Sequence, residues 1–236
     1  MRSNKVYTVA RREFLDIVAN KNTVVAGLLF AGWFSWLHGL GVTVKETDNM
    51  VQLFNGSLIY LTPMVGVFVA YIYSGQAFLF EKAEGIIETL LCAPLNLRAL
   101  WLGKSIGVAF PAWLATLIFA AGFTLLARHY TEAALVPALY VVFHVLVIVP
   151  VFIVAAVGVM GFWQLVLGMR ENQIVNLIVF LGLFLGLSFS GQIMQLGLVT
   201  SWQLIGLLLG VAILFLVFTW WLGRFLNKER IVRSIP

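Results

Sequence analysis

Three acidic residues close together in the sequence are the first candidates for a chemical role. Glu81, Glu84 and Glu88 are spaced by three and four residues, which places their carboxylates along one side of a helix. Pro94 ends or turns this helix. Its apolar side is supplied by Ile87, Leu90 and Leu91. Packed helices are commonly joined by roughly two to eight residues, so the much longer segment 80–104 is expected to be a docking element for another protein.

The tripeptide Gly103-Lys104-Ser105 is a candidate for phosphate binding. A phosphate-binding loop needs a glycine five residues before the second glycine, and a strand in front of it. Arg98 occupies that position, and no strand pattern precedes the site. We therefore expect that this chain does not bind ATP, and that Lys104 is an anchor at the membrane interface.

A nucleophilic serine is the enzymatic alternative, because Gly186-Leu187-Ser188 fits a loose pattern of intramembrane serine proteases. Such a serine needs a base within hydrogen-bond reach. In rhomboid-like proteases the histidine follows the serine, whereas His38, His129 and His144 all precede Ser188. We expect instead a face of small residues for close helix packing. Its members are Gly182, Gly186 and Ser190.

His144 is the exception among otherwise uncharged apolar segments. Ionisable groups at membrane depth mark ion or proton paths, and the expected span cores contain no Asp, Glu, Lys or Arg. We expect His144 to bond to a neighbouring helix, with a substrate or proton role as the alternative.

Cys92 is the single cysteine, and no His and Cys residues have metal-ligand spacing. No metal site is therefore expected, and a separate energy source is needed for any transport.

These residues must be positioned by membrane helices, because the composition leaves little else. The chain has 236 residues, of which 61% are hydrophobic and 11% charged, with a mean hydropathy of +0.99. Soluble domains are about 45–50% apolar and about 25% charged. The composition excludes a soluble enzyme, a DNA-binding domain and a disulfide scaffold.

We expect one all-α polytopic domain over 1–236, with six spans of about 20 apolar residues or more. They are placed at 23–44, 53–79, 105–127, 136–167, 174–197 and 203–223. Pro150 is expected to tilt or break the fourth.

The basic residues predict the orientation of these spans. Of the 15 Lys and Arg residues, 13 fall before the first span, after the last, or in the second and fourth connections. The positive-inside rule then places both termini in the cytoplasm of a multi-pass protein of the cell membrane. Only Lys45 and Arg128 lie on the other side. Topology thus explains the pI of about 9.6, and no nucleic-acid partner is expected.

The segment 1–22 is expected to be an amphipathic helix at the cytoplasmic interface. Arg11, Arg12 and Asp16 lie opposite an apolar side that includes Phe14, in the pattern typical of an interfacial helix. Charges throughout the segment exclude a signal peptide. The alternative is a solvated basic leader that anchors the first span.

The run Glu81-x-x-Glu84-Gly85-Ile86-x-Glu88-x-Leu90-Leu91-x-x-Pro94, followed by Leu102-Gly103-Lys104, resembles the coupling-helix loop of ABC-type exporter permeases of the type 2 class. In that family the motif reads approximately E-x-E-x-G-T-x-E-x-L-L-x-x-P, with a later G-K pair. This chain differs at Ile86 and Ile87, where the family often has small or polar residues. It also leaves only 190–203 for an extracellular element between the last two spans.

The resemblance implies a permease subunit that forms a homodimer or heterodimer and binds a separate cytoplasmic ATPase. ATP and Mg²⁺ would then be bound by that ATPase, with no cofactor and no catalysis in this chain. The contacts with the ATPase would come from Glu81, Glu84, Gly85, Ile87, Glu88, Leu91 and Pro94. The alternative from another class is a membrane scaffold or assembly factor that recruits a cytoplasmic protein. The transported substrate stays open, from lipids and hydrophobic drugs to peptides.

Overall fold

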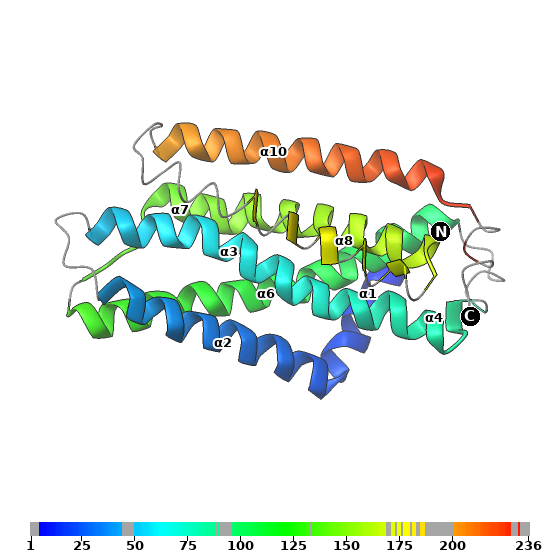
Figure 1. Cartoon of the computed structure of the whole chain (residues 1–236), viewed down its shortest axis with the longest axis horizontal. Helices are drawn as coiled ribbons and strands as arrows, with labels where there is room; N and C mark the ends of the chain where they lie inside the picture. The colour runs from blue at the N-terminus through cyan, green and yellow to red at the C-terminus, as the bar shows by residue number, and fades with distance from the viewer. Residues whose placement is uncertain are drawn as a thin grey trace.

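The protein forms a bundle of long helices that lie roughly side by side (Figure 1). The structure is a computed structural model that describes residues 5–43, 50–87, 89, 96–132, 134–168, 201–227 and 231, with isolated positions between 171 and 186. Every regular element within these ranges is a helix. Four of the described helices are long and apolar enough to cross a membrane, or up to five if a bent pair counts as one span. Six spans were expected; the segment 174–197 lies largely outside the described residues.

The bent pair opens the described chain. Helix α1, Lys5–Ala19, and helix α2, Lys21–Thr43, meet at Asn20 with a bend of 79°. The side chain of Asn20 accepts a hydrogen bond from the backbone N–H of Thr23 at 3.3 Å, which satisfies a free donor at the start of α2. The bend therefore separates α1, which corresponds to the expected interfacial segment, from the long axis of α2.

Helix α3, Met50–Ser74, continues without a break through the π-helix η1, Gly75–Phe80, into the short helix α4, Glu81–Ala83. Each hydrogen bond of a π-helix spans five residues, one more than in an α-helix, and π-helical turns are frequent at functional sites. It ends directly before Glu81 and Lys82. The side chains of these two residues therefore follow a local change in helical register.

Helix α6, Leu97–Thr131, is the longest described helix and packs against α1, α2, α3 and α8. The side chain of Asn96 caps it by accepting a hydrogen bond from the backbone N–H of Arg98 at 3.1 Å. The helix thus begins within the segment 80–104 that was expected to be a connection. Residues 97–104 are helical because neighbouring helices contact them, although their composition is less apolar than that of a span.

The fourth expected span is a composite of α7, Leu139–Phe143, the π-helix η2, His144–Ile148, and α8, Val149–Val166. The break expected near Pro150 is not present: Leu139–Val166 is one continuous helical span, with the π-helix directly in front of Val149 and Pro150. The last long helix, α10, Ser201–Leu222, ends in the 3-10 turn η3, Gly223–Phe225, and packs mainly against α8. Only 22% of its most apolar window is buried, against 72% for the helices that contain α3 and α8. It therefore lies at the periphery of the bundle.

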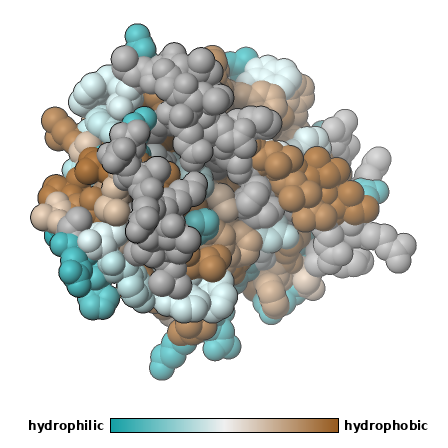
Figure 2. All heavy atoms as spheres, turned by 60° about the vertical axis from the view of Figure 1, so that its left-hand side comes forward, coloured by the Kyte–Doolittle hydropathy of each residue, from teal (hydrophilic) through white to brown (hydrophobic). Residues whose placement is uncertain are grey.

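Apolar side chains also cover much of the described outer surface. Figure 2 shows brown hydrophobic patches over the coloured part of the face in view. Exposed members on α2 and α10 include Leu29, Trp33, Leu214, Val217 and Trp220. Lipid is the solvent that such a surface fits.

Candidate functional site

One end of the bundle collects α1, α4, the start of α6 and the C-terminal ends of α8 and α10; we call it the basic end (Figure 1). Arg98, Trp101 and Lys104 lie there at intervals of three residues along the first turns of α6. This spacing places them on neighbouring faces of the helix. Each of the three contacts a different part of the bundle.

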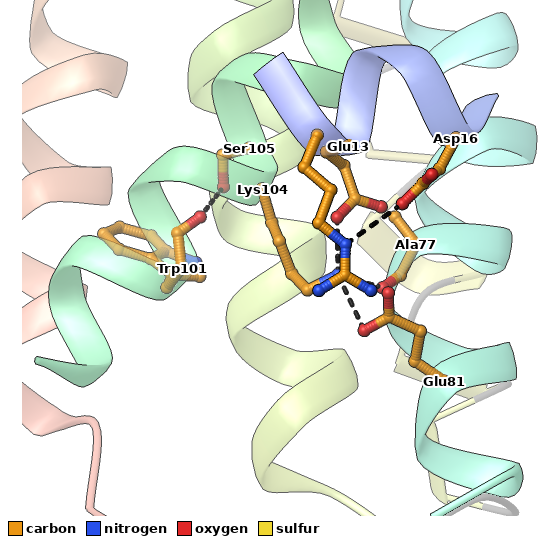
Figure 3. A network of polar contacts seen from close by, with 8 residues as sticks. Glu13, Asp16, Ala77, Glu81, Trp101, Lys104 and Ser105 are labelled. Carbon is orange, nitrogen blue, oxygen red and sulfur yellow. Dashed lines mark hydrogen bonds and ion pairs between the residues drawn. The ribbon is translucent and has the colours of Figure 1, made fainter. Parts of the chain in front are cut away.

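Lys104 lies at the centre of a buried ionic cluster (Figure 3). Its Nζ atom is 2.6 Å from Oε2 of Glu13 on α1 and 2.8 Å from Oε2 of Glu81 on α4. It also donates to the carbonyl oxygen of Ala77 at 2.9 Å and lies 5.6 Å from the ring centroid of Phe78. The side chain of Lys104 is 2% exposed. The cluster joins α1, α4, η1 and α6, and Lys104 is a buried ion-pair partner instead of the interfacial anchor expected from the sequence.

Two glycines of α6 allow α1 to approach Lys104 so closely. A Cβ atom added at Gly103 would lie 2.6 Å from Cβ of Val9, and one added at Gly107 would lie 2.6 Å from Cβ of Glu13. Any side chain larger than hydrogen would collide with α1. Gly103 and Gly107 are four residues apart, so they form one contact surface on α6. The glycine of the apparent phosphate-loop tripeptide therefore serves helix packing.

Lys82, the residue after Glu81, contacts a second helix. Its Nζ atom donates to the carbonyl oxygens of Gln164, Leu165 and Leu167 at 3.3, 3.2 and 2.6 Å. These carbonyls belong to the C-terminal end of α8, where the last turn has no intrahelical donors. A cation is favourable there because of the helix dipole. Lys82 therefore fixes the end of α4 to the end of α8.

Arg98 and Trp101 connect the start of α6 to α8 and α10. Arg98 Nε donates to the carbonyl oxygen of Gly223 at 3.1 Å, directly after the C-terminus of α10. Trp101 Nε1 donates to the carbonyl oxygen of Gly158 in α8 at 3.0 Å, and its indole is 1% exposed. A Cβ atom added at Gly223 would lie 2.6 Å from this indole. The two glycines leave the space that the tryptophan fills.

The segment between α4 and α6 holds the residues that the family resemblance singled out. Gly85 has φ of +71°, a left-handed conformation that favours glycine, and its N–H bonds to the carbonyl of Lys82 at 3.3 Å. It therefore ends α4 and redirects the chain. Glu84 is exposed, whereas Ile87 is 1% exposed and belongs to the core of this chain. Glu88, Leu91 and Pro94 lie outside the described residues.

The acidic row expected along this segment is divided by the structure. Glu81 is paired with Lys104 inside the chain, so its carboxylate is committed within the protein, and Ile87 is equally committed to the core. Of the described acidic residues in the row, Glu84 is the one that faces outward. Four acidic residues are among those that line a cavity of about 800 Å³ between the bend at Asn20 and η1: Glu13, Asp16, Glu81 and Glu84. The acidic surface at the basic end is thus built from α1 as well as from 81–84.

The other residues expected from the sequence fall in three places. Arg11 and Arg12 are exposed on α1, and Arg12 pairs with Asp16 at 3.4 Å. Phe14 is half-buried and packs edge-on against Phe110 of α6, with ring centroids 5.5 Å apart. Gly182 and Gly186 are exposed helical positions, where an added Cβ would meet no atom within 4 Å. The packing face expected there has no contact in the described part of this chain, and Ser190 lies outside it.

His144 is the first residue of η2 and is 1% exposed. Its imidazole lies beside the backbone of Ile59 on α3, and neither ring nitrogen makes a hydrogen bond of regular geometry. The described residues contain no group of three or more His, Cys, Asp or Glu side chains that could hold a metal ion.

Sequence reasoning missed Glu13, Lys82 and Arg98 as site residues. The signal for Glu13 was present: Val6, Ala10, Glu13 and Ile17 are spaced by four, three and four residues, so the acid lies on the buried side of α1. A carboxylate on a buried helix face requires a cationic partner. The partner, Lys104, is 91 residues away, and no local pattern identifies it.

Comparison with known proteins provides one further observation. Over 119 residues, the chain is 30% identical to a Pseudomonas aeruginosa protein described as "Probable ABC transporter permease protein NosY". The match covers 48% of this chain and 42% of that protein, so the chain matches less than half the length of this relative. No protein-family profile matches the chain. About half of the chain is therefore similar to a membrane permease, and its described helices include four that are long enough to span a membrane.

Proposed function

We propose that this chain is the membrane-spanning permease subunit of an ATP-driven exporter, coupled to a separate cytoplasmic ATPase. The observation that carries the proposal is the way in which the segment 80–104 is attached to the bundle. Its described ends contact three other helices through three cations: Lys104 contacts α1, Lys82 contacts the end of α8, and Arg98 contacts the end of α10. Lys104 also pairs with Glu81, so it joins the two ends of the segment to each other. The partial similarity to an ABC transporter permease supports the same function.

The mechanism follows from these attachments. The basic end is the cytoplasmic side, and the ATPase binds the exposed acidic surface that includes Glu84 and Asp16, with Glu88 as a further contact. ATP-driven closure of the ATPase displaces the segment 84–96. Because buried ion pairs and helix caps resist separation, the displacement is transmitted to α1, α6, α8 and α10 together. The spans then move as a unit and expose the substrate path to the other side.

The transport path requires a second subunit, either a second copy or a sister chain. The exposed apolar faces of α2 and α10, and the unpacked Gly182 and Gly186, are the surfaces available to lipid or to that second subunit. The transported substrate stays open: spans whose apolar windows hold at most two Asp, Glu, Lys or Arg residues are compatible with lipids, hydrophobic drugs and peptides.

The test uses the full chain, purified together with its ATPase and reconstituted in nanodiscs. The Glu84→Lys variant should reduce binding of the ATPase, because it reverses the charge of an exposed contact. The Lys104→Met variant with Glu13→Gln and Glu81→Gln should retain binding but lose stimulation of ATP hydrolysis. The matched control is Lys21→Met, an exposed basic residue at the start of α2. If ATPase binding and stimulation both survive Glu84→Lys and Glu88→Lys, the coupling role is wrong.

A membrane scaffold that recruits a cytoplasmic protein is the second candidate, and the same acidic surface supports it. A scaffold needs the exposed carboxylates but not the buried connections to three other helices. It therefore predicts that the variant at Lys104, Glu13 and Glu81 binds its partner and functions normally. Loss of stimulation with retained binding separates the two proposals.

A further inference from the structure

The centre of the bundle contains a polar residue that the proposed function does not use. His144 is 1% exposed and is the first residue of the π-helix η2, which packs against α3. Neither of its ring nitrogens makes a regular hydrogen bond. A buried polar group without a partner costs free energy. Its position therefore needs a physical explanation.

The explanation lies across the interface, in the middle of α3. Pro63 is inside this helix and has no N–H, so the carbonyl four residues earlier loses its helical donor. That residue is Ile59, and the imidazole of His144 lies beside its backbone. The hydroxyl of Thr62 already bonds to the carbonyl of Leu58 at 2.7 Å. The carbonyl of Ile59 is thus an acceptor in need of a donor, and His144 is a donor in need of an acceptor.

Hydrogen bonds on both sides hold the neighbours of these two residues in place. Asn55, one turn before Ile59, accepts a hydrogen bond from the backbone N–H of Ala138 at 3.0 Å, at the start of α7. On the other side of η2, Trp113 Nε1 donates to the carbonyl of Val145 at 3.1 Å. The π-helix is therefore fixed to α6 and the start of α7 to α3. Between these two fixed points, the imidazole of His144 has no regular hydrogen bond and faces a helix interrupted by Pro63, where helices commonly kink.

We propose that His144 is a latch on the Pro63 hinge of α3: the imidazole N–H bonds to the Ile59 carbonyl to hold the hinge, and its release lets the two halves of α3 bend. This inference is independent of the proposed function. α3 continues into Glu81 and Lys82, which anchor its C-terminal end at the basic end of the bundle. The hinge therefore lies between this anchored end and the other half of the helix.

A pair of spin labels measures the bend directly. Val51 and Phe80 lie near the two ends of the segment α3–η1, on either side of Pro63, and are 60% and 65% exposed. In a Cys92→Ser background, labels at Val51→Cys and Phe80→Cys report the distance distribution across the hinge in nanodiscs. His144→Leu should broaden or shift this distribution, and His144→Gln, which keeps an N–H donor, should restore it. Pro63→Ala supplies the missing backbone donor, so His144→Leu should have no effect in that background.

His38→Leu is the matched control, because His38 also lies in a long apolar helix but contacts the ring of Phe34. It should leave the distribution unchanged. The latch is wrong if His144→Leu has no effect, or if it broadens the distribution equally with and without Pro63.

Unfolding equilibria supply a second measurement. Membrane hydrogen bonds typically couple by about 0.6 to 1.7 kcal/mol, so the effect of His144→Leu on the unfolding constant should differ between the two backgrounds by about 3- to 18-fold. A ratio near one also overturns the proposal.

Discussion

A single ammonium group neutralises part of a buried cluster with two carboxylates. Lys104 is 2% exposed, Glu13 7% and Glu81 16% at the side chain, so water screens the three charges weakly. The ammonium therefore forms ion pairs with both acids at once and also donates to the Ala77 carbonyl. Removing it would leave two carboxylates facing each other in a poorly solvated site.

Lys104→Met should lower the free energy of unfolding by about 3–5 kcal/mol, the usual cost of breaking a buried ion pair by removing one partner. Equilibrium unfolding in detergent measures the change. Combining the substitution with Glu13→Gln and Glu81→Gln should recover most of the loss, because the uncompensated charges are gone.

Arg12→Met is the control for this experiment. Arg12 and Asp16 form an exposed pair, 62% and 56% exposed at the side chain, and such pairs contribute about 0–1 kcal/mol. A Lys104→Met protein as stable as the parent would contradict the buried ionic cluster.

At the level of helices, the close contact between α1 and α6 depends on glycines that leave room for α1 as much as on charge. Gly107→Ala would place a Cβ atom 2.6 Å from Cβ of Glu13 and 2.7 Å from the carbonyl oxygen of Ala10. Overpacking of this kind costs about 1–3 kcal/mol, and we expect α1 to move away from α6.

A thiol introduced by Ile17→Cys in a Cys92→Ser background reports this movement, because Ile17 is 1% exposed. Its maleimide labelling rate should rise about 5- to 160-fold in the Gly107→Ala protein, the range that corresponds to that cost. Gly32→Ala is the matched control, since an added Cβ there meets no atom within 4 Å. Equal labelling in both variants would refute the close contact between α1 and α6.

The C-terminal end of α8 should depend on Lys82. Its ammonium donates to three carbonyls in and after the last turn. Lys82→Met should remove this donor, lower the stability of the last turn by about 1–2 kcal/mol and let it fray. Hydrogen–deuterium exchange should increase in peptides that cover residues 162–168. Lys21→Met, at an exposed position, should leave their exchange unchanged; no increase with Lys82→Met would show that the cap is dispensable.

Helices and contacts differ in how far the sequence predicts them. Long apolar runs are visible in a hydropathy window, and α3, α6, α8 and α10 overlap the expected spans. The start of α6 at Leu97 is not visible in this way, because contacts of Arg98 and Trp101 with distant glycines stabilise residues 97–104. The π-helices break the 3.6-residue period on which helical patterns depend. Lys104 was recognised as a charged residue near a span, but Glu13 as its partner required the tertiary structure.

In the molecule as a whole, charged groups gather at one end and the proposed topology follows from them. Lys82, Arg98 and Lys104, which contact helix ends or buried acids, all lie at the basic end. The opposite end of α6 carries Arg128, whose Nε bonds to the carbonyl of Leu135, followed by the exposed Glu132 with φ of +52°. Positive charge favours the cytoplasmic side, so the two ends should face different compartments.

Two single-cysteine proteins test this orientation in intact cells. In a Cys92→Ser background, a membrane-impermeant maleimide should label the Glu132→Cys protein from outside, because residue 132 is exposed at the end opposite the basic end. The Glu84→Cys protein, also exposed, should react only after the membrane is permeabilised. Parent protein without cysteine gives the background. The reverse pattern would place the acidic surface outside the cell, where no cytoplasmic ATPase could reach it, and would refute the proposed coupling together with the topology.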